Sequence, residues 1–158
     1  MTHPKEEKTL IILKPDAVHR GLMGEVIGRL ERKGLKIIGM KMIQLEDAIL
    51  EAHYVHIKDK PFFSGIKDYM KSAPVVVMAL SGINAVDATR LIVGPTKGYE
   101  AAAGTIRGDL SLSMQSNIVH ASDSVETGMA EVERFFKDDE LFAYTRNDFN
   151  FINAEEVF

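Results

Sequence analysis

Cysteine is absent from this 158-residue chain, which excludes disulfide bonds, thiolate metal sites and cysteine nucleophiles. Any covalent catalysis must therefore use His, Ser, Thr, Lys, Tyr or a carboxylate. Long apolar runs are absent too, so no segment is expected to span a bilayer, and residues 1–8 are polar rather than of signal-peptide type. We therefore expect a cytoplasmic protein without a membrane partner.

An excess of positive charge and the common phosphate-binding motifs are also missing. The formal net charge is −4, and neither a basic stripe nor an aromatic RNA-binding signature marks a nucleic-acid surface. We therefore expect no nucleic-acid partner. The motifs G-x-x-x-x-G-K-S/T and G-x-G-x-x-G do not occur. A nucleotide would therefore have to be bound by a phosphate-binding site of another kind. A small anion needs only a few basic groups directed at one point, so the net charge does not exclude such a site.

The apolar residues that are present predict one globular domain over residues 1–158. Short apolar runs predict strands at 9–13, 35–45 and 75–80 and a strand end at 117–120, whereas helical spacing predicts helices at 22–33, 46–56, 61–71, 84–93 and from 123 onward. This order predicts a ferredoxin-like α/β (α+β) sandwich. We expect a four-stranded antiparallel sheet with helices on one face, an added helical hairpin and a long functional loop at 94–108.

The last long helix carries more specific predictions. Asp123 can cap its first turn, with Glu126 three residues on as its partner. Glu131 lies about 12 Å along the axis from Asp123 at 1.5 Å per residue, so helical spacing gives no reason to pair it with His120. The predicted buried stripe of this helix consists of Val125, Met129, Val132 and Phe136.

His120 is the sharpest candidate for chemistry. It follows the apolar pair Ile118-Val119 and precedes Ala121, whose small side chain leaves the imidazole open to a bulky reactant. A neutral imidazole is nucleophilic near neutral pH. Position alone nevertheless favours a strand-end histidine without a special role, since His53 and three other histidines show how common a lone His is.

Several basic and polar residues could hold a phosphate. Arg107 lies in a loop with Gly104 and Gly108, where the backbone can approach a ligand, and guanidinium groups match phosphate oxygens. A salt bridge with Asp109 explains Arg107 about as well. Lys14 follows the first strand, although a strand-terminating surface lysine is the simpler interpretation. The remaining members of this group, each also explained by an ordinary surface or turn position, are Arg90, Thr96 and Lys97.

A cluster of apolar residues surrounds a Lys-Pro-Phe-Phe turn. Its members are Tyr54, Phe62, Phe63 and Ile66. An aromatic side chain near a surface turn could stack on a base, but such residues more often belong to the core, and we expect Phe63 to do so.

Together these residues resemble the nucleoside diphosphate kinase family along nearly the whole chain. The strongest match is residues 117–123 (NIVHASD), which resemble the family's active-site signature. The other matches, in order and at family spacing, are residues 14–16 (KPD), 20–22 (RGL), 60–63 (KPFF) and 104–109 (GTIRGD). Any one motif is weak, whereas five in register are specific.

The resemblance implies a ping-pong transfer of the γ-phosphoryl group of a nucleoside triphosphate to a nucleoside diphosphate through a phosphohistidine on His120. By the family pattern Glu131 and Ser122 support the histidine, and Lys14 and Tyr54 belong to the catalytic group. The implied nucleotide-binding residues are Lys14, Phe62, Ile66, Arg90, Thr96, Arg107, Met114 and Asn117.

The resemblance also implies a cofactor and partners. Mg²⁺ should enter with the nucleotide, bridging phosphate oxygens, without a dedicated protein cage. The substrates would include ATP, GTP and GDP, and the chain would form a homo-oligomer, either a tetramer or a hexamer. The aromatic tail at 147–158, with Phe149, Phe151 and Phe158, could pack at a subunit boundary or fold back on its own chain.

Two alternatives stay open at this point. A non-catalytic nucleotide-binding regulatory protein could share the fold, because fold alone does not prove activity. Such a relative should lose the histidine or an arginine, and this chain keeps both. A nucleic-acid-binding module is the third hypothesis, against which stands the missing basic face.

Overall fold

A computed structural model of the chain describes residues 3–154, so Phe158 of the tail lies outside the described residues. One antiparallel sheet forms the centre, in the strand order β2-β3-β1-β4. The strands are β1 (Glu6–Leu13), β2 (Lys36–Ile43), β3 (Val75–Ile83) and β4 (Val119–Ala121). The predicted four-stranded antiparallel sheet is therefore confirmed.

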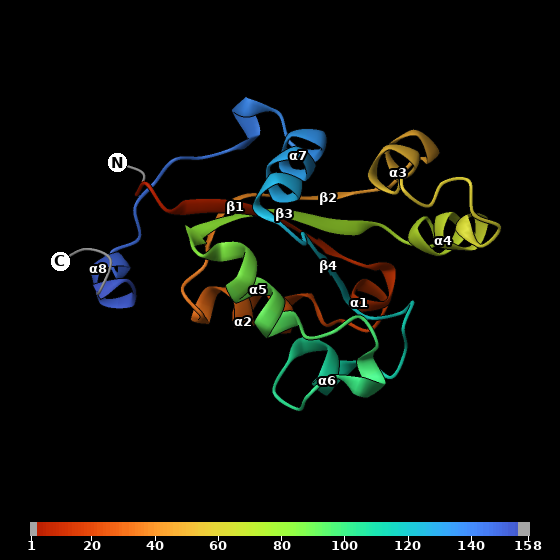
Figure 1. Cartoon of the computed structure of the whole chain (residues 1–158), viewed down its shortest axis with the longest axis horizontal. Helices are drawn as coiled ribbons and strands as arrows, with labels where there is room; N and C mark the ends of the chain where they lie inside the picture. The colour runs from red at the N-terminus through yellow and green to blue at the C-terminus, as the bar shows by residue number, and fades with distance from the viewer. Residues whose placement is uncertain (1–2, 155–158) are drawn as a thin grey trace.

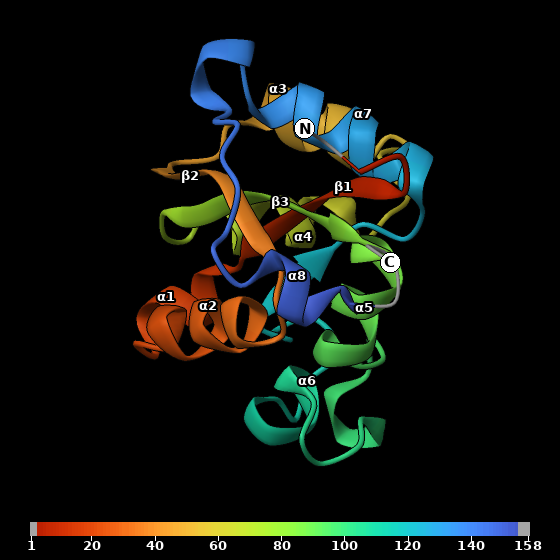
Figure 2. The same ribbon diagram turned by 90° about the vertical axis from the view of Figure 1, so that its left-hand side faces the viewer.

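Helices cover both faces of this sheet (Figure 1, Figure 2). One face carries α1 (Pro15–His19), α2 (Met23–Arg32) and α5 (Ala85–Val93), and the other carries α3 (Asp47–His53) and α7 (Val125–Phe135). The remaining helical segments are α4 (Phe63–Met70), η1 (Gly98–Glu100), α6 (Ile106–Leu110), η2 (Asp138–Glu140) and α8 (Phe149–Ile152). The expectation that helices cover only one face is wrong.

The side chains of β1 explain why both faces of the sheet are covered. Successive side chains of a strand point to opposite faces, and residues 9–13 are all buried. Ile11 and Leu13 join the core under α2 and α5, whereas Leu10 and Ile12 join a second core that contains Val132 of α7. A strand without a polar face requires cover on both sides.

Two segments acquire helical structure that the sequence patterns do not predict. Pro15 ends β1, as expected, but it also occupies the first turn of α1, where its missing N–H is no loss. The long loop at 94–108 contains η1 and the start of α6. The added pair of helices, α3 and α4, follows the prediction and lies between β2 and β3 in the sequence.

The N-terminus of α7 differs from the prediction by one residue. Ser124, not Asp123, is the N-cap, and its Oγ accepts the N–H of Thr127 at 3.1 Å. A serine hydroxyl can satisfy this third amide of the helix as well as a carboxylate can. Asp123 therefore lies outside the helix, and the predicted pairing with Glu126 is wrong.

The buried face of α7 is also rotated from the predicted stripe. Val125 and Met129 are 41 % and 51 % exposed, and Phe136 is buried but follows the helix. Val132 is buried as predicted, and the helix also buries Gly128, Glu131 and Phe135. A Cβ on Gly128 would lie 2.4 Å from the carbonyl oxygen of Lys8, so this glycine lets α7 lie close against β1. The spacing of apolar residues does not reveal this buried face, because two of its members are a glycine, Gly128, and a carboxylate, Glu131.

The C-terminal segment 141–154, which includes the described part of the tail, lies against the rest of the chain. The N–H of Phe142 donates to the carbonyl of Ile38 at 2.8 Å, and Ile152 of α8 contacts Gly34 at the turn between α2 and β2. Phe151 remains exposed. Of the helices that the structure describes, none has both the length and the apolar character that a membrane crossing requires.

Candidate active site

His120 is held on β4 by an unusual backbone conformation two residues before it. Ile118 is buried and has φ +74°, a conformation that β-branched residues rarely adopt. Its N–H donates to Asp16 Oδ2 at 3.0 Å, and its carbonyl accepts the N–H of Lys14 at 2.9 Å. These bonds fix β4 against the start of α1. Strain of this kind clusters at functional sites, where the surrounding structure must maintain it.

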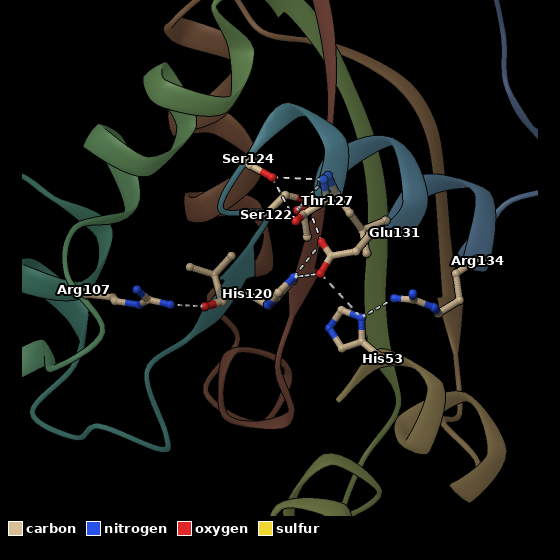
Figure 3. A network of polar contacts seen from close by, with 10 residues as sticks. His53, Arg107, His120, Ser122, Ser124, Thr127, Glu131 and Arg134 are labelled. Carbon is tan, nitrogen blue, oxygen red and sulfur yellow. Dashed lines mark hydrogen bonds and ion pairs between the residues drawn. The ribbon is translucent and has the colours of Figure 1, made fainter. Parts of the chain in front are cut away.

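A carboxylate lies directly behind the imidazole of His120 (Figure 3). Nε2 of His120 lies 3.0 Å from Oε2 and 3.1 Å from Oε1 of Glu131. The hydroxyl of Ser122 donates to Oε2 of Glu131 at 2.6 Å and accepts the N–H of Leu10 at 3.0 Å. A carboxylate can only accept, so Nε2 carries the proton and the neutral ring presents a lone pair at Nδ1.

The electrostatics of Glu131 agree with this arrangement. Burial alone would raise the pKa of this carboxyl, but hydrogen bonds from His120 and Ser122 hold the pKa below its usual value. Helical spacing gave no reason to expect the pair, because it measures distance along α7 only. The helix packs across β1, and this packing brings its middle turn next to β4.

An open pocket of about 190 Å³ lies in front of His120. Most of the residues expected to bind phosphate and sugar line it together. These are Lys14, Arg90, Thr96, Arg107 and Asn117, with Tyr54, Met114 and His120 beside them. Residues distributed between positions 14 and 120 therefore converge on one small volume.

Arg107 is the most constrained cation of the pocket. It is buried, and its guanidinium donates to the carbonyls of Asn117, Gly94 and Val119 at 3.2, 3.0 and 2.6 Å. Burial, with a smaller contribution from the charge of nearby Arg90, lowers the pKa of Arg107 to about 10. The alternative salt bridge with Asp109 is not formed, since that carboxylate pairs with Arg29 at 2.7 Å.

Lys14 is held by an amide rather than by an acid. Its Nζ donates to Asn117 Oδ1 at 2.6 Å, and the amide nitrogen of Asn117 donates to the carbonyl of Thr96 at 2.8 Å. Burial lowers the pKa of Lys14 to about 8, with a further contribution from Arg107. None of the residues lining this pocket is acidic. Lys14, Arg90 and Arg107 form no ion pair with a carboxylate within residues 3–154, and three such cations suit a multiply charged anion.

The residues expected to contact the nucleotide base do not all lie at the pocket. Met114 lines the pocket and is largely exposed, whereas Phe62 is exposed at the start of α4 and Ile66 packs against the second core. Neither Phe62 nor Ile66 lines the pocket, so their role at the base stays a prediction. Phe63 is buried, which confirms its expected place in the core. Burial raises the pKa of Tyr54 to about 12, and Glu131 adds to the effect.

Comparison with known proteins identifies the family. The family model described as "Nucleoside diphosphate kinase" matches residues 7–141. A nucleoside diphosphate kinase of Parabacteroides distasonis is 53 % identical over 152 residues, which are 96 % of this chain and 99 % of that protein. One of Archaeoglobus fulgidus is 50 % identical over 149 residues, which are 94 % of this chain and 99 % of that protein. The chain belongs to the nucleoside diphosphate kinase family.

Solved structures of the family agree with the fold. The nucleoside diphosphate kinase of Halobacterium salinarum in complex with CDP has a TM-score of 0.90 at 38 % identity, covering 93 % of this chain and 98 % of that one. The transition state mimic of the Borrelia burgdorferi enzyme with bound vanadate and ADP has a TM-score of 0.85 at 33 % identity, covering 91 % and 95 %. The ferredoxin-like arrangement predicted from the order of strands and helices is therefore confirmed for this member of the family.

His53 is a residue of the site that the sequence patterns do not single out. Its ring lies edge-on against His120, with centroids 4.6 Å apart, and its Nδ1 is 3.7 Å from Glu131 Oε1. Burial, with a smaller contribution from His120, lowers the pKa of His53 to about 3, so the ring is neutral. The only available signal was that His53 directly precedes Tyr54.

The donor set of the pocket bears on the expected Mg²⁺. This ion takes oxygen ligands, often carboxylates, and keeps several waters. The pocket offers amines, guanidinium groups and amides but no carboxylate. Such a lining fits a metal that arrives on the phosphates of a nucleotide and does not fit a dedicated protein cage.

Proposed function

We propose that the chain transfers the γ-phosphoryl group of a nucleoside triphosphate to a nucleoside diphosphate through Nδ1 of His120. The lone pair of Nδ1 attacks the γ-phosphorus, the bond to the bridging oxygen breaks, and the diphosphate leaves with that oxygen. A terminal oxygen of a second diphosphate then attacks the same phosphorus. The N–P bond breaks, and its electron pair returns to Nδ1.

The observation that carries the proposal is the bond between His120 Nε2 and Glu131. It directs the protonated nitrogen to the rear, so the free lone pair is at Nδ1. It also places a negative charge next to the ring when the imidazole becomes positive on phosphorylation. The hydroxyl of Ser122 holds Glu131, and the amide of Asn117 holds Lys14. Both groups are therefore in position before the substrate binds.

The pocket lining supports the assignment of the substrate groups. Arg90, Arg107 and Thr96 would hold the phosphates, Lys14 and Asn117 would reach the sugar and the terminal phosphate, and Tyr54 would lie close by. The base would stack between Phe62 and Met114, with Ile66 beside it, and stacking of this kind reads only a π face. Mg²⁺, carried by the nucleotide, would neutralise phosphate charge.

The proposal includes a setting and an assembly. We propose one domain over the whole chain, working in the cytoplasm as a homo-oligomer, a tetramer or a hexamer, with the tail from 147 at a subunit boundary. The exposed Phe151 supports the last point. Sedimentation of the purified chain tests the assembly, and a monomer at micromolar concentration contradicts it.

Mixing the purified chain with ATP labelled at the γ-phosphate tests the reaction. The label should appear on the protein in an acid-labile, alkali-stable form, map to His120, and leave as labelled GTP when GDP is added. His120→Gln should still bind ATP but take up no label.

The control variant is His19→Gln, because His19 lies on α1 away from the residues of the pocket. It should label as the unmodified chain does. If ATP binds to the unmodified chain and no label transfers, the chain is a non-catalytic nucleotide-binding protein. If His120→Gln labels normally, the nucleophile is another residue.

A further inference from the structure

Three side chains behind the pocket direct metal-binding atoms at one point (Figure 3). His53, His120 and Glu131 each offer one such atom, and the three atoms lie within 4.8 Å of one another. Oε1 of Glu131 lies between the two rings, 3.1 Å from His120 Nε2 and 3.7 Å from His53 Nδ1. In a tetrahedral zinc site with bonds of about 2.0–2.1 Å, neighbouring ligand atoms lie about 3.3 Å apart. The two separations from Oε1 are close to that value, and the two ring nitrogens lie within the 4.8 Å that bounds the set.

The second oxygen of Glu131 is already occupied by a group that would support such a site. Ser122 donates to Oε2 at 2.6 Å, which leaves Oε1 directed at the imidazoles. Hydrogen bonds of this kind orient metal ligands and are a regular part of metal sites. Glu131 and His53 are 6 % and 2 % exposed, whereas the His120 side chain is 21 % exposed. An ion would therefore enter past His120 and keep its remaining position for water.

His53 presents a lone pair to the same point. The guanidinium of Arg134 lies 3.3 Å from His53 Nδ1, and a guanidinium has only donors, so this nitrogen must accept. Nε2 of His53 then carries the proton, and that buried atom has no hydrogen-bond partner among the described residues. Arg134 is exposed and can move into solvent, which frees Nδ1 for another cation.

We propose that His53, His120 and Glu131 form an inhibitory site for Zn²⁺, which Mg²⁺ does not occupy. Two imidazoles and one carboxylate are the donor set of zinc sites with an open position. Mg²⁺ prefers an octahedral oxygen shell, so two imidazole nitrogens discriminate against it. The two metals would therefore use opposite sides of His120, with Mg²⁺ on the phosphates in front and Zn²⁺ behind.

The consequence for His120 follows from its two nitrogens and rests on the proposed function. A neutral imidazole has one proton and one lone pair on its nitrogens. When Zn²⁺ takes Nε2, the single proton of the ring must be on Nδ1. Nδ1 then has no free lone pair, so the ring cannot attack a phosphorus. Zinc would block phosphorylation without occupying the nucleotide pocket.

Zinc titration of the folded, nucleotide-free chain against a chromophoric chelator tests the site. The unmodified chain should bind one Zn²⁺. His53→Gln should weaken binding by about tenfold or more through the loss of a ligand, which corresponds to about 1.4 kcal/mol. His56→Gln is the matched control, since His56 is an exposed histidine three residues away, and it should bind zinc as the unmodified chain does.

Arg134→Met provides a second variant that keeps all three ligands. Removing the competing cation should tighten zinc binding by about threefold or more. Equal affinity in the unmodified chain, His53→Gln and His56→Gln would overturn the site. If His53→Gln fails to fold, an unchanged affinity of Arg134→Met overturns it instead.

The inhibitory consequence has its own measurement. Zinc added before γ-labelled ATP should prevent labelling of the protein, a chelator should restore it, and extra Mg²⁺ at the same concentration should have no effect. Labelling that persists at saturating zinc contradicts the inhibition. A metal-free chain that never takes up label contradicts the proposed function alone, because the titration still decides whether zinc binds.

Discussion

Two arginines at opposite ends of the sheet are held in opposite ways. Arg146, directly before the tail, forms a bidentate pair with Asp148 of the tail, at 2.8 and 2.7 Å, and donates to the carbonyls of Glu31 and Leu35. Its hydrogen bonds to Asp148 raise its pKa. Arg107 in the pocket is held by three carbonyls and no carboxylate, and burial lowers its pKa to about 10.

The charge of Arg146 stabilises the fold, whereas the charge of Arg107 remains available for a bound anion. Carbonyl oxygens fix the direction of a guanidinium without neutralising it, so Arg107 retains its attraction for an anion. The tail neutralises Arg146 with a neighbouring acid, and the fold gains stability from the pair. In the free protein the buried, unneutralised cations of the pocket lower the stability of the fold. A bound polyphosphate would neutralise them and remove this loss of stability.

The largest effect should come from Lys14→Met, which removes one uncompensated cation. The rate of phosphoryl transfer should fall by about 10²–10³-fold, as for the loss of other charge-stabilising donors. Stability at pH 7 should nevertheless rise, on the order of 1–2 kcal/mol, because burial disfavours the ammonium form. Single-turnover labelling and urea unfolding measure the two effects.

The pH dependence of that gain has a definite sign. Folding lowers the pKa of Lys14 from 10.5 to about 8, so the unfolded chain binds more protons between these values. The penalty from Lys14 is complete below pH 8 and disappears as pH rises toward 10.5. The stability advantage of Lys14→Met should shrink over this range, and an advantage that is constant from pH 7 to 10 would refute the desolvation argument.

The opposite result is expected at the other end of the sheet. Arg146→Met should cost about 1–3 kcal/mol of unfolding free energy, because a bidentate ion pair and two hydrogen bonds to carbonyls are lost. The rate of transfer should not change, since Arg146 is not among the residues that line the pocket. Arg146→Lys is the control and should recover part of the stability by restoring the charge.

A smaller effect is expected from Glu131→Gln, which changes the support behind His120. The folded chain holds the pKa of Glu131 below 4.5, so this carboxylate stabilises the fold above that pH. That contribution is lost as pH falls through the depressed pKa. Acid unfolding of Glu131→Gln should therefore be less steep below pH 4.5, and an unchanged acid transition would contradict the assignment.

The smallest effect should follow from Ser124→Ala, which removes the N-cap of α7. The expected cost is about 1 kcal/mol of unfolding free energy. Ser124→Asp keeps a capping oxygen and should cost less. Thermal unfolding measures both variants, and equal losses would show that the hydroxyl does not cap the helix.

Local patterns were sufficient for most of the fold but for little of the site. Apolar runs and helical spacing located the strands and the main helices, because each depends on which side chains are buried nearby. The pairing of Glu131 with His120 depends on how α7 crosses the sheet, which the spacing of residues along a helix does not contain. Family resemblance pointed to that pair. His53 carried no separate signal, since its partners come from β4 and α7.

The backbone of Ile118 makes the position of His120 depend on the whole fold. An isoleucine at φ +74° persists only while Asp16 and Lys14, more than a hundred residues earlier, hold its amide and carbonyl. A partly unfolded chain keeps His120 but loses the geometry that aims it. The amount of phosphohistidine formed in a single turnover should therefore be proportional to the number of natively folded molecules. Under increasing denaturant, this amount should fall before the opposite end of the sheet unfolds.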